Sequence, residues 1–245
     1  CLDALGQIEE VYKRIYQWSK TDETNIHMAA FSSFISAREK KETAHKYCNN
    51  PLDFLYISNI SNHLDNSGAF IKRVIDELSN IKTFWEPQER ATKNGFQSRL
   101  NIFEYPNENI DYLKSIIIDE LKSYYNNYQN NEVSLIQKWP SETSFKAWHV
   151  ILKQNGYQVP HIHPDAWVSG IIYLKNVPSM GNCEGNTEFS LNGQYYSNKG
   201  SPTFMYQPKL GDIVIFPSSL HHRTIPFTTN SERIIISFDL KDKNK

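Results

Sequence analysis

Four of the eight histidines lie in two short segments about sixty residues apart. The first segment contains His161, His163 and Asp165, and the second contains the pair His221-His222. Side chains alternate between the two faces of an extended strand, so positions 161, 163 and 165 would point the same way. A metal ion needs such convergence, with two or three ligands from one strand end and another from a partner strand. Imidazole and carboxylate donors without a thiolate favour Fe(II) over a structural zinc ion.

A simpler interpretation of these histidines stands beside the metal site. A single histidine near a strand is commonly a hydrogen-bonding residue, and the doubled His221-His222 can arise by chance. Each segment, however, lies next to a stretch that predicts a strand. Two such segments in one chain favour a metal site over a coincidence.

The elements that must position these residues are strands in the second half and helices in the first. Runs rich in Val, Ile, Tyr and Phe predict strands at 145–153, 168–175, 187–191, 212–216 and 233–240. Apolar residues at three- and four-residue steps predict helices at 2–15, 26–46, 69–78 and 110–125. Helices followed by strands predict an α+β fold, in which a jelly roll or cupin-like barrel packs on helical supports.

The first 48 residues form a separate helical segment in this reading, either a cap on the barrel or the end of a helical repeat array. One helix pair cannot establish a repeat period. A breaker at Asn49-Asn50-Pro51 follows, so the chain divides into a helical segment at 1–48 and a catalytic domain at 49–245, with the barrel core at about 132–245. The polar stretch 126–131 predicts the linker into that core. The chain opens on Cys1 rather than Met, which favours a piece of a longer protein.

Composition gives no support for several classes of partner. Lys and Arg total 26 against 27 for Asp and Glu, so no excess of positive charge attracts nucleic acid or an anionic membrane. No apolar run reaches the roughly 18 residues that span a bilayer. The three cysteines, at positions 1, 48 and 183, form neither a disulfide framework nor a zinc ribbon, which predicts a reducing, cytoplasmic location.

Two longer motifs make the second half recognisable. The first runs His161-Ile-His163-Pro-Asp165-Ala-Trp-Val-Ser-Gly-Ile-Ile-Tyr173, and the second runs Gly211-Asp-Ile-Val-Ile-Phe-Pro217, followed by His222, Pro226 and Arg233. Both resemble the 2-oxoglutarate/Fe(II) oxygenase superfamily, in particular the oxygenase domains often found after tetratricopeptide repeats. The resemblance covers residues 145–240 and extends more weakly to 51–65 and 85–97. It implies a double-stranded β-helix with supporting N-terminal helices, and it allows helical repeats upstream.

The resemblance assigns roles to individual residues. His161 matches the first metal ligand, and His222 matches the distal ligand rather than His221. Arg233 and Tyr173 match the groups that bind the distal carboxylate of 2-oxoglutarate, a task that suits the bidentate guanidinium.

The third ligand departs from the usual pattern, because His163 stands where a carboxylate is expected. Either His163 completes a three-histidine site, or Asp165 turns back to supply the carboxylate, or waters take the remaining positions. Strand geometry favours His163, because an extended chain carries Asp165 roughly 6–7 Å further along.

The implied activity is that of a dioxygenase that uses Fe(II), 2-oxoglutarate and O2, with ascorbate as a stimulant, to hydroxylate an amino-acid side chain in a peptide or protein. Two alternatives stay open. One is a barrel that binds metal without turnover, and the other is a cupin-like enzyme that uses three histidines without an oxoacid.

Overall fold

The computed structural model describes residues 2–105, 107–178 and 180–244, so Cys1 and the expectation attached to it lie outside the described residues. The α-helices are α1 (Ile8–Thr21), α2 (Ile26–Glu39), α3 (Ser67–Leu78), α4 (Glu108–Tyr128) and α5 (Ser134–Gln137). Short 3-10 turns occupy Pro51–Phe54, Ile60–Asn62 and Ile102–Glu104. The strands are β1 (Tyr56–Asn59), β2 (Thr83–Trp85), β3 (Thr92–Ser98), β4 (Thr143–His161), β5 (Val168–Lys175), β6 (Thr187–Ser190), β7 (Thr203–Tyr206), β8 (Asp212–Pro217), β9 (His221–Thr224) and β10 (Arg233–Asp242).

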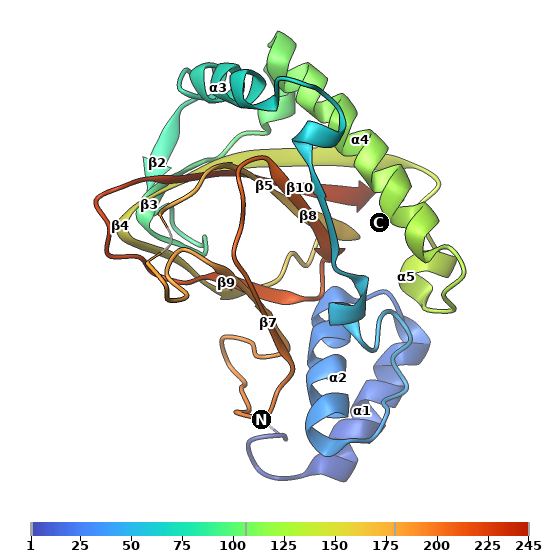
Figure 1. Cartoon of the computed structure of the whole chain (residues 1–245). Coiled ribbons are helices and arrows are strands. Elements are labelled where there is room, and N and C mark those ends of the chain that lie inside the picture. Colours follow the sequence, from blue (N-terminus) through green and yellow to red (C-terminus); the bar gives the residue numbers. More distant parts are fainter. Residues whose placement is uncertain (1, 106, 179, 245) are drawn as a thin grey trace.

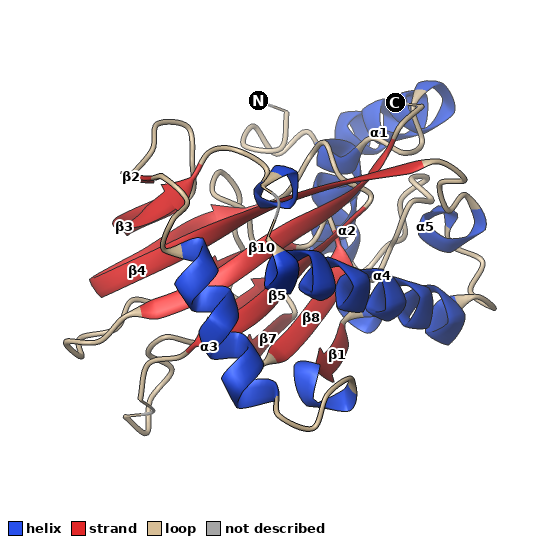
Figure 2. Ribbon diagram, turned by 90° about the horizontal axis from the view of Figure 1, so that it is seen from above, coloured by secondary structure: helices blue, strands red, loops and turns tan. Residues whose placement is uncertain are grey.

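One curled antiparallel sheet forms the body of the molecule (Figure 1). Its strands follow the order β1-β8-β5-β10-β4-β9-β6-β7, and β3 pairs with β4 and with β2. The predicted α+β class with a double-stranded β-helix is confirmed. Figure 2 shows α3 and α4 lying across one face of the sheet, while α1 and α2 lie together beyond another end of it in Figure 1.

Strand β4 belongs to both halves of the curled sheet. Its first part pairs with β10, and its end pairs with β9 through Gln158 and His161. The change of direction falls at Asn155, whose φ is 62°, and at Gly156. A Cβ on Gly156 would lie 2.6 Å from the Lys153 carbonyl oxygen and 2.8 Å from that of Asn94, so only glycine fits this bend. The bend brings the end of β4 beside β9.

Two apolar cores hold the helices to the sheet. The larger core lies between the sheet and α3 and α4, with Ile110, Leu113 and Ile117 fully buried on α4. The second core fills the curl of the sheet and continues into α1 and α2 through Val11 and Phe34. The position of the barrel interior is therefore tied to both helix pairs.

Several predicted boundaries were wrong. The second helix ends at Glu39 rather than near residue 46, because Lys40 adopts a left-handed conformation with φ 52°. The polar stretch 126–131 begins inside α4, which runs to Tyr128. Strand β4 continues to His161 instead of ending at residue 153, and β1, β2, β3, β7 and β9 were not predicted.

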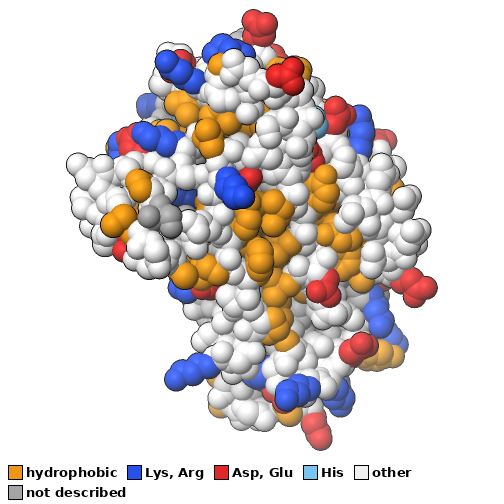
Figure 3. Space-filling model, in the orientation of Figure 1, with side chains coloured by type: hydrophobic (Ala, Val, Ile, Leu, Met, Phe, Trp, Pro, Cys, Tyr) orange, Lys and Arg blue, Asp and Glu red, His pale blue; other side chains and the backbone are white. Residues whose placement is uncertain are grey.

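The surface agrees with the balanced charge of the sequence. Figure 3 shows acidic and basic side chains scattered over one face, around a central band of hydrophobic ones. Among the described residues, no helix combines the length and the hydropathy needed to cross a membrane.

Candidate metal centre

Three histidine side chains converge at the end of β4. We call His161, His163 and His222 the histidine cluster, because one ring nitrogen of each lies within 4.8 Å of those of the other two. His161 and His222 are direct cross-strand partners on β4 and β9, and their ring centroids are 4.2 Å apart. The expectation that His161 and His163 share one strand holds only in part, because β4 ends at His161. The His163 N–H instead donates to the Ser218 carbonyl, 3.1 Å away, and this contact holds the residue beside the strand end.

The Nδ1 atom of each ring in the cluster is engaged by the protein. His161 Nδ1 lies 2.8 Å from the Val159 carbonyl oxygen, and His222 Nδ1 lies 3.2 Å from that of Leu220. A carbonyl oxygen only accepts, so these two Nδ1 atoms carry the proton and donate it. The Nε2 lone pairs are therefore left free, as a metal ligand requires.

His163 makes the third such contact, to a carboxylate. Its Nδ1 lies 2.6 Å from Asp239 Oδ1, and Ser169 Oγ donates to the same oxygen at 2.8 Å. Asp239 was missed at the sequence level. The sequence did hold one signal for it. Asp239 is six residues after Arg233 in β10, so both side chains face the same side of the strand, and both place a charge in an otherwise apolar strand.

Burial keeps His161 and His222 uncharged. Loss of solvation, and then the neighbouring His163, lower the pKa of His161 to about 3. Burial, and then His161, hold the pKa of His222 well below its usual range. The imidazoles of His161 and His222 are therefore neutral near pH 7, which is the form that binds a metal ion.

Two other predicted residues lie outside the cluster. The Asp165 side chain is 84% exposed, and its carboxylate approaches Lys241 Nζ at 3.9 Å. His221 faces the opposite side of β9 from His222, and its ring packs against Tyr196 with a centroid distance of 5.4 Å. Neither side chain belongs to the group of three that could share an ion.

Arg233 and Tyr173 meet inside the barrel. The guanidinium carbon of Arg233 lies 5.2 Å from the Tyr173 ring centre, and both side chains donate to Thr187 Oγ1 at 2.9 Å. Thr187 was not predicted. Thr187 precedes Phe189 by two residues on β6, so both side chains face the same side, and Phe189 is the cross-strand partner of His222. Thr187, with Tyr173 and Arg233, therefore faces the interior beside the histidine cluster.

The Arg233 guanidinium is buried, and no acidic side chain of the described residues forms an ion pair with it. The residue is 1% exposed, and within the described part of the chain its Nε and Nη1 have no hydrogen-bond partner. Burial lowers the pKa of this group. An unpaired buried cation is costly, so the arrangement fits a ligand that brings a carboxylate to it.

A cavity of about 290 Å³ opens onto His161 and His163. We call it the inner cavity. Its wall includes Trp148 and the loop residues 89–91 between β2 and β3. The cluster can thus be reached by a small group from outside the barrel.

Residues 146–239 match the model of a protein family described as "Putative 2OG-Fe(II) oxygenase". The predicted resemblance to the 2-oxoglutarate/Fe(II) oxygenases is confirmed. The oxygenase match contains the histidine cluster together with Tyr173, Arg233 and Asp239. A search of curated proteins found no match.

Solved structures of oxygenases share the fold at low sequence identity. A prolyl hydroxylase from Trichoplax adhaerens, in complex with a peptide fragment of the hypoxia inducible factor oxygen degradation domain, has a TM-score of 0.56 and 15% identity over 91% of this chain and 96% of that chain. A prolyl-4-hydroxylase from Pseudomonas putida has a TM-score of 0.52 and 12% identity over 77% and 92%. HygX from Streptomyces hygroscopicus, with nickel and 2-oxoglutarate bound, has a TM-score of 0.52 and 9% identity over 77% and 83%.

Proposed function

We propose that this chain is an Fe(II)- and 2-oxoglutarate-dependent dioxygenase that hydroxylates an amino-acid side chain in a peptide or protein. The observation that carries the proposal is the buried guanidinium of Arg233, which has no carboxylate partner among the described residues, beside three convergent histidines. A barrel that only binds metal would not require a buried guanidinium such as that of Arg233 to bind a carboxylate.

The donor set fits the implied groups. Three imidazoles without a thiolate suit Fe(II), and the proposed ligands are His161, His163 and His222. Arg233 and Tyr173, with Thr187 between them, would bind the distal carboxylate of 2-oxoglutarate. When bound, iron and the oxoacid supply the oxidising chemistry with O2.

Other residues hold the histidine rings in position and shield them from water. Asp239 fixes the His163 ring, and Ser169 fixes Asp239. Phe189 and Phe216 pack on the His222 ring, with centroids 6.2 and 4.7 Å away, and keep water from that side of the cluster. The inner cavity leaves the other side accessible to a substrate side chain.

A protein or peptide substrate is supported by analogy. The Trichoplax prolyl hydroxylase, which shares the fold, holds a peptide fragment in its structure. The inner cavity of this chain opens onto His161 and His163 and can admit a substrate side chain. A cytoplasmic location and helical repeats upstream remain predictions from the sequence.

The second candidate is a cupin-like enzyme that oxidises a thiol or small molecule with three histidines and without an oxoacid. The presence of His163 in place of a carboxylate favours it. Arg233 counts against it, since that reaction leaves the guanidinium without a partner.

Succinate release from 2-oxoglutarate, in the presence of iron and ascorbate, tests the proposal. The purified chain should release succinate, and Arg233→Ala should raise the half-saturating 2-oxoglutarate concentration at least about tenfold, because a charge-assisted bidentate contact contributes roughly 1.5–3 kcal/mol. Iron binding should survive in this variant. An unchanged half-saturating concentration would contradict the role of Arg233, and turnover without 2-oxoglutarate would favour the three-histidine alternative.

A further inference from the structure

Basic side chains without fixed partners line the inner cavity. Lys146 on β4 and Lys241 on β10 extend from the same face, since Lys146 pairs with Asp239 and Lys241 with Ser144 across the two strands. Among the described residues, the side chains of Lys146 and Arg90 form no ion pair or hydrogen bond, although the Arg90 main-chain N–H donates to the Pro87 carbonyl. Within the same described residues, the Lys241 side chain makes one long ion-pair contact, the 3.9 Å approach of its Nζ to Asp165.

The acidic groups of the same wall are either engaged or turned outward. Asp239 is held by His163 and Ser169. Asp165 is mostly in solvent, with 84% of its side chain exposed. Glu89 lies exposed on the loop between β2 and β3. The positive charges near the histidine cluster are thus the ones free to bind a ligand.

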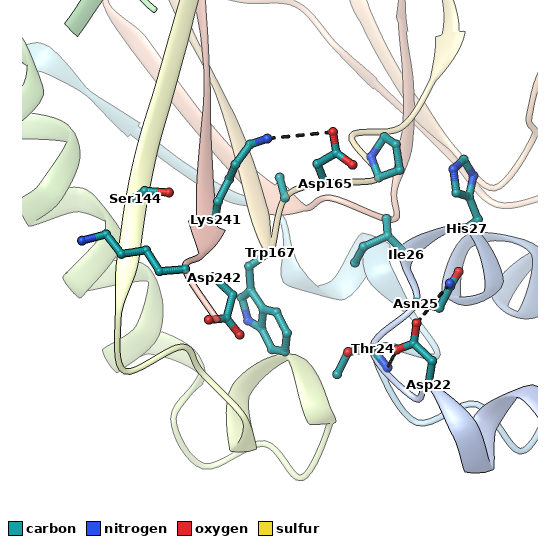
Figure 4. A pocket seen from close by; sticks show the side chains of 13 residues that line it. Asp22, Thr24, Asn25, Ile26, His27, Ser144, Asp165, Trp167, Lys241 and Asp242 are labelled. Atoms are coloured by element: carbon teal, nitrogen blue, oxygen red, sulfur yellow. Dashed lines mark hydrogen bonds and ion pairs between the residues drawn. The ribbon is translucent and has the colours of Figure 1, made fainter. Parts of the chain in front are cut away.

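A second, larger hollow adjoins the inner cavity. This outer cavity, of about 700 Å³, lies between the start of α2 and the strands β4 and β10, and it shares Pro164, Asp165 and Lys241 with the inner cavity. Figure 4 shows Lys241 reaching toward Asp165 between these walls. The outer cavity is lined by both acidic and basic side chains, including Asp242 and Lys243. It could therefore hold an extended peptide without selecting for the charge of that peptide.

We propose that the substrate is a polypeptide with an acidic side chain next to the oxidised residue, and that Lys146 and Lys241 bind this carboxylate. The carboxylate replaces Asp165 as the partner of Lys241, and the chain continues past Pro164 into the outer cavity. The inference rests on the proposed hydroxylase function and names its substrate class. A small free acid fits it less well, because it would leave the outer cavity empty.

Peptide pools with different flanking charges test this inference. Three randomised pools would carry mainly acidic, mainly amide or mainly basic residues, and mass spectrometry would count 2-oxoglutarate-dependent gains of one oxygen in each. We expect wild type to favour the acidic pool over the basic pool by about tenfold. Lys146→Glu and Lys241→Glu together should invert that ratio, and the corresponding Gln variants should bring it near one. Because the ratio is measured within each variant, a general loss of activity cancels.

Two further variants sharpen the test. Asp165→Asn removes the competing partner of Lys241, so it should raise the acidic preference severalfold. Lys72→Glu, an exposed charge on α3 away from both cavities, is the matched control and should keep the wild-type ratio. Equal oxidation of the pools, a ratio unmoved by the paired Glu variant, or oxidation of single amino acids as readily as peptides would overturn the inference. Absence of succinate release with iron and 2-oxoglutarate would instead overturn the proposed function.

Discussion

Each ring of the histidine cluster is oriented by a different acceptor. His161 and His222 use main-chain carbonyls, whereas His163 uses the carboxylate of Asp239. A carboxylate acceptor makes an imidazole more basic than a carbonyl acceptor does. His163, which stands where the resemblance leads one to expect an acidic ligand, is thus the histidine whose Nδ1 contacts a carboxylate, that of Asp239.

This arrangement predicts which side chain serves as the third ligand. His163→Ala should lower iron affinity more than Asp165→Ala, because Asp165 points into solvent while His163 faces the other two rings. Iron titration of the two variants measures the difference. Tighter iron retention in His163→Ala than in Asp165→Ala would assign the ligand role to Asp165.

The two neighbouring histidines of β9 provide a matched pair for the distal ligand. His222→Ala should abolish iron binding, and His221→Ala should retain most of it, because adjacent residues of a strand face opposite sides. The reverse result would mean that the register of β9 is wrong by one residue.

His149 on β4, outside the histidine cluster, is a buried polar side chain that lowers the stability of the fold. It is 1% exposed, and neither of its ring nitrogens has a hydrogen-bond partner among the described residues. Burial lowers the pKa of His149 to about 4, so the folded chain resists a proton that the unfolded chain accepts below pH 6.5. Since the unfolded state then binds more protons, stability falls as the pH drops from about 6.5 to about 4.

The variant His149→Leu should remove this pH dependence. Urea unfolding should give a similar or higher midpoint than wild type at pH 7.5, since an unpaired polar group is replaced by an apolar one. At pH 5 the advantage of the variant should grow by roughly 1–3 kcal/mol. A difference between the two proteins that is the same at both pH values would show that His149 has a partner in solution.

The sequence alone predicted part of the site, and the two residues that it missed were missed for the same reason. His161, His163, His222, Arg233 and Tyr173 stand in motifs with recognisable spacing. Thr187 and Asp239 stand in none, and their importance comes from side-chain hydrogen bonds that span 46 and 76 residues of sequence, to Arg233 and His163 respectively. Such partners become visible only when the register between strands is known.

At the level of elements, the contact between β5 and β10 sets the spacing around Asp239. Gly170 lies opposite Phe238, and a Cβ on Gly170 would come within 2.1 Å of the Phe238 ring. The ring therefore lies over the glycine, and the adjacent pair Ser169 and Asp239 meets on the other face.

Gly170→Ala should therefore destabilise the chain by about 1–3 kcal/mol, as overpacking in a core does. Thermal or urea unfolding measures this loss. Gly200→Ala is the control, because its Cβ would meet only the Asn198 side chain at 3.7 Å. Equal stability of the two variants would contradict the close approach of β5 and β10.

The elements that could be predicted were those with continuous apolar or periodic sequence. Strands β5, β8 and β10 and helices α1, α3 and α4 are of this kind. In contrast, β9 consists of His221-His222-Arg223-Thr224, and its strand conformation depends on its pairing with β4 and β6. Local propensity carries no signal for such an element.

At the scale of the whole molecule, the first 48 residues and the barrel share contacts. Phe34 of α2 belongs to the apolar core that fills the curl of the sheet, and Tyr47 donates to the Trp167 carbonyl at 2.5 Å. We infer that the helical segment predicted at 1–48 is a cap that folds with the barrel.

Cooperative unfolding tests this inference. Tryptophan fluorescence, which reports on Trp18 and Trp167 among others, and far-ultraviolet circular dichroism should give coincident urea transitions. Phe34→Ala should lower the single midpoint, with a loss of about 3–5 kcal/mol. Two separate transitions, with only one of them moved by this variant, would indicate an independent helical domain.

Strand β10 is synthesised after all the other described strands, yet it lies between β4 and β5 in the middle of the sheet. While the chain emerges from the ribosome, β4 and β5 therefore each keep an unpaired edge, and such edges are prone to aggregation. Pairings between segments so far apart in sequence also form slowly, because long loops must close first. His161 and His163 precede His222 by about sixty residues, and the anchor of His163, Asp239, comes later still. Under the proposed function, iron would therefore bind late in folding, because a nascent chain released before β10 would lack both the closed sheet and the Asp239 anchor of His163.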